Sequence, residues 1–147
     1  MGTWAILGFL AGAVLLFLVV SARTSVATEA IAGWTGARAG VKYSVQNYGS
    51  WKREDGRLVE IVTIHVPSPD RVAHPLEVNA RGGRPRVDDP SRQTEIDALL
   101  RLGAEYIDVG YNTDWIAADF MVDRVTVDHP LAEKVVDLLA ALREKSR

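Results

Sequence analysis

The chain lacks cysteine throughout its 147 residues, and its net charge is only −2. Without cysteine there are no disulfides, no thiolate zinc sites, no thiol catalysis and no acylated cysteine anchor. A near-balance of acidic and basic side chains gives no strong attraction to a polyanion, so we expect no nucleic-acid partner. The composition fits a reducing compartment.

Recognisable catalytic motifs are also missing. The three histidines, His65, His74 and His129, are far apart in the sequence. No two of them have the i, i+4 spacing of a helical metal site. No serine lies in a nucleophile-elbow context. We therefore expect no catalytic residue and no cofactor, and we interpret His65 as a structural residue of a strand.

Charge is absent from one long stretch, residues 4–20, which reads WAILGFLAGAVLLFLVV. As a helix this stretch reaches about 26 Å at 1.5 Å per residue, close to the hydrocarbon thickness of a bilayer. Trp4 stands at its outer end, where an indole favours the headgroup layer. The pattern predicts a single transmembrane helix over residues 1–22 that remains attached as a signal anchor.

A cleavable signal peptide is the main alternative for this segment. Residues 20–22 and 25–27 both resemble small-x-small cleavage sites, but no Lys or Arg precedes the apolar run. Arg23, Arg38 and Lys42 follow it, and the positive-inside tendency then places the C-terminal body in the cytoplasm. An extracytoplasmic domain, or secretion after cleavage, are the other possibilities.

Gly8 and Gly12 form a GxxxG pair within the apolar run. Two glycines one turn apart let a second helix approach closely in lipid. The pair predicts a helix–helix contact, with another membrane protein or with a second copy of the chain. The expected partners are thus the lipid bilayer and a further transmembrane helix.

Residues 23–40 are rich in Gly and Ala and predict a juxtamembrane helix extension and linker, and residues 41–147 predict a small soluble domain. Apolar residues alternate near 41–46, 76–80 and 107–111. Residues 58–66 form a more continuous apolar strand, which predicts a central position in the sheet. Asp89 is expected to cap a helix that starts at Pro90, and Asp128 to cap a final helix with Pro130 in its first turn. The expected fold class is α+β, of approximate order βββαββα after the transmembrane helix, with both helices packed on one face of the sheet.

Residues 115–127 are ambiguous. Ile116, Ala118 and Phe120 alternate as in a strand, but Trp115, Ile116 and Phe120 would also share one face of a helix. We favour a strand, split near Asp123.

An acidic series runs through the C-terminal third of the chain. It comprises Glu105, Asp108, Asp114, Asp119, Asp123 and Asp128. With His129, three of these residues (Asp119, Asp123 and Asp128) are weak candidates for a divalent-metal site, because carboxylates are the ligands of hard cations. The spacing matches no calcium-loop pattern, so the simpler interpretation is a solvated sheet face with turn residues.

A basic, glycine-containing loop lies at 81–86. Its candidate binding residues are Arg81, Gly82, Gly83, Arg84 and Arg86. A glycine pair leaves the backbone free to wrap an anion, and arginines near a bilayer attract anionic headgroups. The alternative interpretation is a solvated loop balanced by Asp88 and Asp89.

Together these features predict a non-enzymatic accessory protein that holds a small interaction domain at the membrane. The second hypothesis is a membrane-proximal module that binds an anionic ligand or lipid through loop 81–86. The third is a divalent-metal-dependent enzyme that uses the acidic series 105–128.

Overall fold

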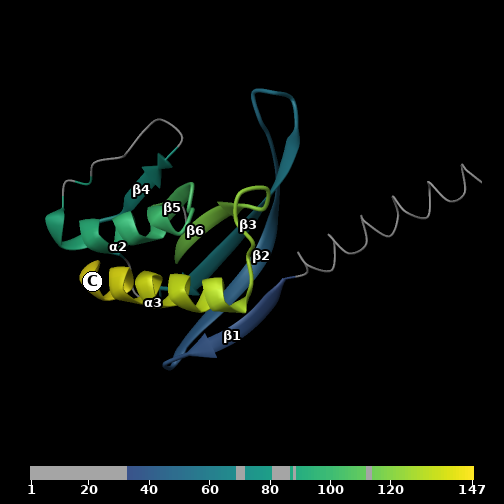
Figure 1. Cartoon of the computed structure of the whole chain (residues 1–147). Coiled ribbons are helices and arrows are strands. Elements are labelled where there is room, and N and C mark those ends of the chain that lie inside the picture. The colour runs from purple at the N-terminus through teal and green to yellow at the C-terminus, as the bar shows by residue number, and fades with distance from the viewer. Residues whose placement is uncertain (1–32, 69–71, 81–86, 88, 112–113) are drawn as a thin grey trace, which may run out of the picture. The chain divides into compact units, whose positions relative to one another are not determined.

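The computed structural model describes residues 33–68, 72–80, 87, 89–111 and 114–147. These residues form six strands and two helices (Figure 1). The elements are β1 (Trp34–Arg38), β2 (Val41–Lys52), β3 (Leu58–Pro67), β4 (Leu76–Asn79), α2 (Pro90–Arg101), β5 (Tyr106–Val109), β6 (Trp115–Met121) and α3 (His129–Lys145).

This architecture corrects the expected fold class. The order βββαββα lacks one strand, because β1 occupies residues 34–38 of the segment assigned to the linker. Among the residues that the structure describes, no helix is long and apolar enough to cross a membrane. The span expected over 1–22, with its Gly8–Gly12 pair, lies outside the described residues. The assignment as a single-pass membrane protein with a signal anchor is therefore unsupported, and what stands is a six-stranded antiparallel sheet with two helices.

The strands lie in the order β1-β2-β3-β6-β5-β4, and every neighbouring pair is antiparallel. The continuous apolar run of β3 agrees with its position between β2 and β6. Pairing of β2 with β3 continues to Lys52 and Leu58, whereas pairing of β3 with β6 ends at Ile61 and Met121. The β2–β3 hairpin therefore projects beyond its neighbours, as Figure 1 shows.

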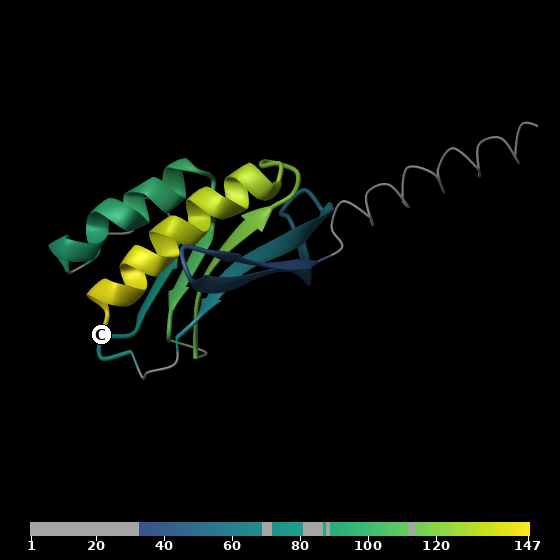
Figure 2. The same ribbon diagram turned by 90° about the horizontal axis from the view of Figure 1, so that it is seen from below.

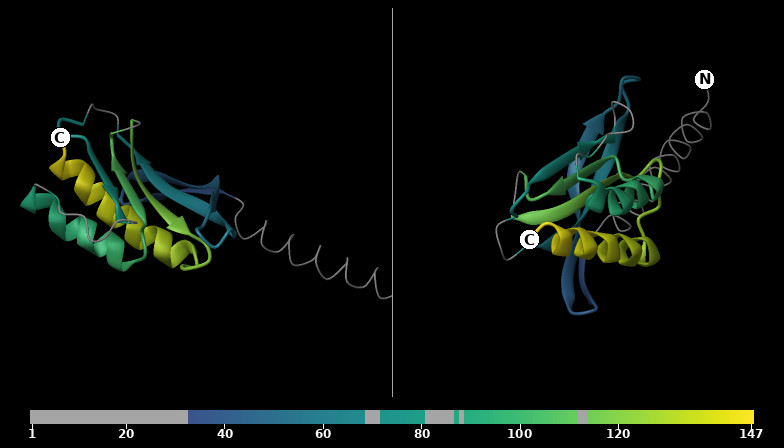
Figure 3. Two further views of the ribbon diagram at one scale, coloured as in Figure 1. Left: turned by 90° about the horizontal axis from the view of Figure 1, so that it is seen from above. Right: turned by 90° about the vertical axis from the view of Figure 1, so that its left-hand side faces the viewer.

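The two helices lie side by side against one face of the sheet (Figure 2 and Figure 3). The side chains directed at them come from alternate strand positions such as Val45, Ile64 and Phe120, all at most 1% exposed. They meet Ile96 of α2 and Leu139 of α3, which are fully buried. Burying each such side chain contributes about 1.5–3 kcal/mol, so this layer is the core.

Both helices begin where their capping signals predict. The Asp89 carboxylate accepts a hydrogen bond from the Ser91 backbone N–H, and Asp128 accepts one from Leu131. Gly103 follows α2 with a φ of +102°, a left-handed conformation that glycine adopts without strain. Residues 115–121 form a strand, as preferred, and the chain turns after Met121.

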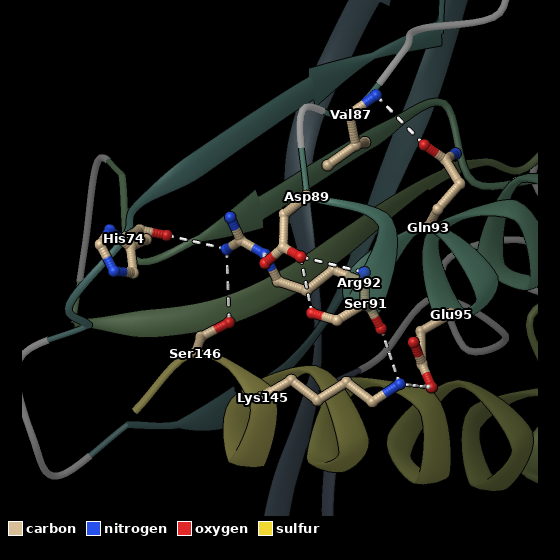
Figure 4. A network of polar contacts seen from close by, with 9 residues as sticks. All are labelled: His74, Val87, Asp89, Ser91, Arg92, Gln93, Glu95, Lys145 and Ser146. Atoms are coloured by element: carbon tan, nitrogen blue, oxygen red, sulfur yellow. Dashed lines mark hydrogen bonds and ion pairs between the residues drawn. The ribbon is translucent and has the colours of Figure 1, made fainter.

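One buried cation joins the ends of the two helices (Figure 4). The Arg92 side chain is 7% exposed. Its Nε donates to Asp89 at 3.0 Å and its Nη1 to the His74 carbonyl at 2.8 Å, with Ser146 Oγ at 3.4 Å. Nearby, Lys145 Nζ lies 2.7 Å from Glu95 and from the Ser91 carbonyl. This network fixes the start of α2 against the end of α3.

Candidate functional site

The face of the sheet turned away from α2 and α3 carries a groove of about 380 Å³. No described helix lies on this face (Figure 2). The groove is lined from β2 by Gln46 and Tyr48, from β3 by Thr63 and His65, from β5 by Tyr106 and Asp108, and from β6 by Trp115, Ala117 and Asp119. We call it the open-face groove.

Strand register brings these side chains together. Asp119 of β6 is paired with Thr63 of β3 on one side and with Tyr106 of β5 on the other. Directly paired residues of antiparallel strands project from the same face. The three side chains therefore form a row across the sheet, and His65, Ala117 and Asp108 form the next row.

The floor of the groove is polar and well ordered by hydrogen bonds. Thr63 Oγ1 donates to Asp119 Oδ1 at 2.6 Å. Asp108 Oδ1 accepts from the Tyr111 backbone N–H at 2.7 Å. Thr63 and Asp108 are only 7% and 6% exposed. Burial, together with a hydrogen bond to Glu77, raises the pKa of Tyr106 above its ordinary value, so this phenol remains protonated at neutral pH.

Two aromatic rings stand at the rim. Tyr48 is 74% exposed and Trp115 is 42% exposed. The register places Trp115 opposite Pro67 of β3, whereas Tyr48 follows the residue opposite Val62, so the rings belong to opposite ends of the groove. The Trp115 ring meets His65 edge-on, with centroids 4.5 Å apart. Burial lowers the pKa of His65, which keeps its imidazole neutral at pH 7.

Tyr48 lies two residues after Gln46 and therefore on the same face of β2, and a β-bulge at residues 47–49 leaves it without a directly opposed residue on β3. The pairing of β2 with β3 shifts between Asn47 and Gly49, Gly49 has a φ of +120°, and its N–H donates to Asn47 Oδ1 at 2.9 Å. The extra residue shifts the alternation of β2 for the residues that follow, so that Ser50 is opposite Glu60 and Trp51 is opposite Val59. The Asn-x-Gly pattern of residues 47–49 is the sequence signal for this bulge.

The candidate metal ligands are dispersed in the structure. Asp119 lies in the open-face groove, and Asp123 forms an ion pair with Arg53 at 2.8 Å. Asp128 caps α3, and His129 packs its ring 4.8 Å from that of Trp34. In the described part of the chain, no three His, Asp or Glu side chains are grouped as metal ligands would be. Of the acidic series, the structure brings Asp108 and Asp119 into one groove.

The candidate anion-binding residues Arg81, Gly82, Gly83, Arg84 and Arg86 lie outside the described residues. A second, wider groove of about 1160 Å³ is lined by residues of the β2–β3 hairpin and of the C-terminal end of α2. Its basic residues are Lys52, Arg53, Arg57, Arg101 and Arg124. Three of them form ion pairs, Arg53 with Asp123, Arg57 with Asp55 and Arg124 with Glu105. This groove therefore has mixed charge. The C-terminal end of α2, which borders it, carries partial negative charge and disfavours an anion.

Comparisons of the chain with protein-family models, with curated proteins and with solved structures give no match.

Proposed function

We propose that this protein is a non-enzymatic recognition domain that binds its ligand in the open-face groove. The observation that carries the proposal is the asymmetry of the sheet. One face is buried beneath α2 and α3, while the other presents a groove with polar side chains on its floor and exposed aromatic rings at its rim. Concave sites that combine aromatic surface with a few placed polar groups are typical of small-molecule binding.

Exposed aromatic residues contribute to the same surface. Among the described residues four aromatic side chains are exposed, and two of them, Trp115 and Tyr48, line the open-face groove, one toward each end. Beneath them, the Thr63–Asp119 hydrogen bond joins β3 to β6 and orders the floor of the groove. A preordered floor lowers the conformational cost of binding.

A ligand-observed NMR screen of the full chain, with mixtures of small charged and neutral compounds, tests the proposal. Trp115→Ala is expected to abolish the binding of hits, because it removes the ring at one end of the groove. Trp51→Ala is the matched control, since Trp51 is an equally exposed indole (46%) that lines the wider groove instead. Hits that survive Trp115→Ala and Tyr48→Ser but are lost in Trp51→Ala would overturn the proposal and assign binding to the wider groove.

A further inference from the structure

We propose that the open-face groove takes a small organic cation, an alkylammonium or guanidinium compound. This inference rests on the proposed function, that the groove is the ligand site, and adds the chemical class of the ligand. It follows from the charge, the aromatic surface and the size of the groove.

The charged side chains that line the groove are acidic. Asp108 and Asp119 belong to the lining, and Glu77 borders it through its hydrogen bond to Tyr106. The described lining residues include no Lys or Arg, and the one imidazole, His65, has a pKa lowered by burial. Asp119 accepts a hydrogen bond from Thr63, and Asp108 accepts one from the Tyr111 N–H, so both carboxylates are held in place within the groove.

Aromatic rings flank these carboxylates. Trp115, Tyr48 and Tyr106 each line the groove. The face of an aromatic ring carries negative charge and attracts a cation, most strongly in tryptophan. Aromatic side chains grouped around a site hold quaternary ammonium groups in proteins. A carboxylate beside them adds charge attraction. An anion would meet the two aspartates at close range, which disfavours it.

The absence of grouped metal ligands among the described residues and the volume of the groove indicate what kind of cation fits. A metal ion needs several ligands grouped around it, and the described residues hold no such group. A volume of about 380 Å³ matches a small molecule, at the lower end of the usual range for such sites. The chemistry that fits both is an organic cation, held by charge at the floor and by ring faces at the rim.

Two matched pairs of probes test this inference on the full chain by NMR titration of backbone amides. The first pair is choline and its uncharged carbon isostere dimethylbutanol, and the second is N-acetylarginine methyl ester and N-acetylcitrulline methyl ester. In each pair the shape is kept and the charge is removed. We expect the charged member to shift amides of β3, β5 and β6 around Thr63, Tyr106 and Asp119, and the neutral member to leave them unchanged.

Isosteric variants separate charge from shape. Asp119→Asn keeps an oxygen acceptor for Thr63 and is expected to weaken binding of the cation about tenfold, because one attractive charge is lost. Glu144→Gln removes an equal charge from an exposed site on α3 and is expected to leave affinity unchanged. Circular dichroism melting of Asp119→Asn confirms that a loss of affinity does not reflect unfolding.

The outcomes distinguish the two proposals. Equal shifts of the groove amides by charged and neutral probes, or unchanged cation affinity in Asp119→Asn, would overturn the cation inference while leaving the groove as a binding site. Binding of cations at other amides, insensitive to Trp115→Ala, would overturn both proposals. No binding of either cation, with neutral or anionic hits in the groove, would overturn the cation inference alone.

Discussion

The guanidinium of Arg38 on β1 makes a two-bond contact with the carboxylate of Asp137 on α3, with Nε–Oδ1 and Nη2–Oδ2 distances of 2.7 Å and 2.9 Å. A third bond of 3.0 Å joins Arg38 to Glu133, one turn earlier on the same helix. These contacts attach the edge strand of the sheet to the helix layer, 99 residues away in sequence. The bidentate geometry is the favourable one for an arginine–carboxylate pair.

The Arg38–Asp137 pair predicts an acid-sensitive attachment of β1. A hydrogen bond from Arg38, with its positive charge, lowers the pKa of Asp137. The unfolded chain therefore binds a proton at higher pH than the folded chain, near the ordinary value of about 3.9. The stabilisation is complete above that pH and is lost as pH falls through the lower folded pKa.

We expect Asp137→Asn to increase hydrogen–deuterium exchange of β1 amides at neutral pH roughly two- to fivefold, and to remove part of the acid dependence seen in the parent chain. Glu144→Gln, on the same helix but away from Arg38, is the control. Identical β1 exchange in all three proteins at pH 7 would contradict a role of this pair in attaching the strand.

Arg92 predicts a larger effect on stability, because its side chain is buried. Arg92→Met removes the donor for the His74 carbonyl and for Asp89, and leaves both oxygens to find water or remain unpaired. We expect the free energy of unfolding to fall by about 2 kcal/mol, less than for a fully enclosed pair because Asp89 is 38% exposed. Chemical denaturation measures this change.

Arg101→Met provides the comparison on the same helix, since Arg101 is exposed in the last turn of α2. We expect less than about 0.5 kcal/mol for this control. Equal destabilisation by the two variants would show that the network in Figure 4 contributes nothing beyond a surface charge.

The local signals at the two helix starts and in β3 predict these elements correctly. The starts of α2 and α3 followed from an aspartate before a proline, and the central position of β3 from its apolar run, because each depends on neighbouring residues alone. β1 was missed for the opposite reason. Its Gly36 resembles a linker residue, but in the structure the Tyr43 side chain packs over this glycine, and a Cβ there would lie 2.5 Å from the end of that ring unless Tyr43 shifted.

The open-face groove depends on relationships that no local pattern contains. Its residues come from four strands, and their meeting requires the register of β3 with β6 and of β6 with β5. The acidic series includes Asp108 and Asp119 among six candidate carboxylates. The sequence does not indicate that only these two of the six share a groove. Tyr48 and Trp115 carried no sequence signal for binding, because exposure distinguishes them from core aromatic residues.

Asp128 allows the capping and metal-binding interpretations to be separated. Its carboxylate accepts the Leu131 N–H at 2.9 Å. We expect Asp128→Ala to lower the free energy of unfolding by about 1 kcal/mol, and Asp128→Ser to restore most of it, since serine is also a good cap. Thermal melts in chelator and in millimolar magnesium or calcium measure both variants. A stabilisation of the parent chain by either ion that Asp128→Ala abolishes would contradict a purely capping role.

We expect the imidazole of His65, which lines the open-face groove, to titrate at a lower pH than an exposed histidine. Burial lowers its pKa below the ordinary value of about 6.5, because desolvation disfavours the imidazolium. The unfolded chain thus takes up the proton first, and this group reduces stability as pH falls below about 6.5.

NMR titration of the imidazole proton signals is expected to give a midpoint for His65 below that value. Trp115→Ala uncovers the ring and is expected to raise the midpoint toward it, whereas Trp51→Ala leaves it unchanged. A midpoint in Trp115→Ala equal to that of the parent chain would show that the indole 4.5 Å away does not shield His65 from water.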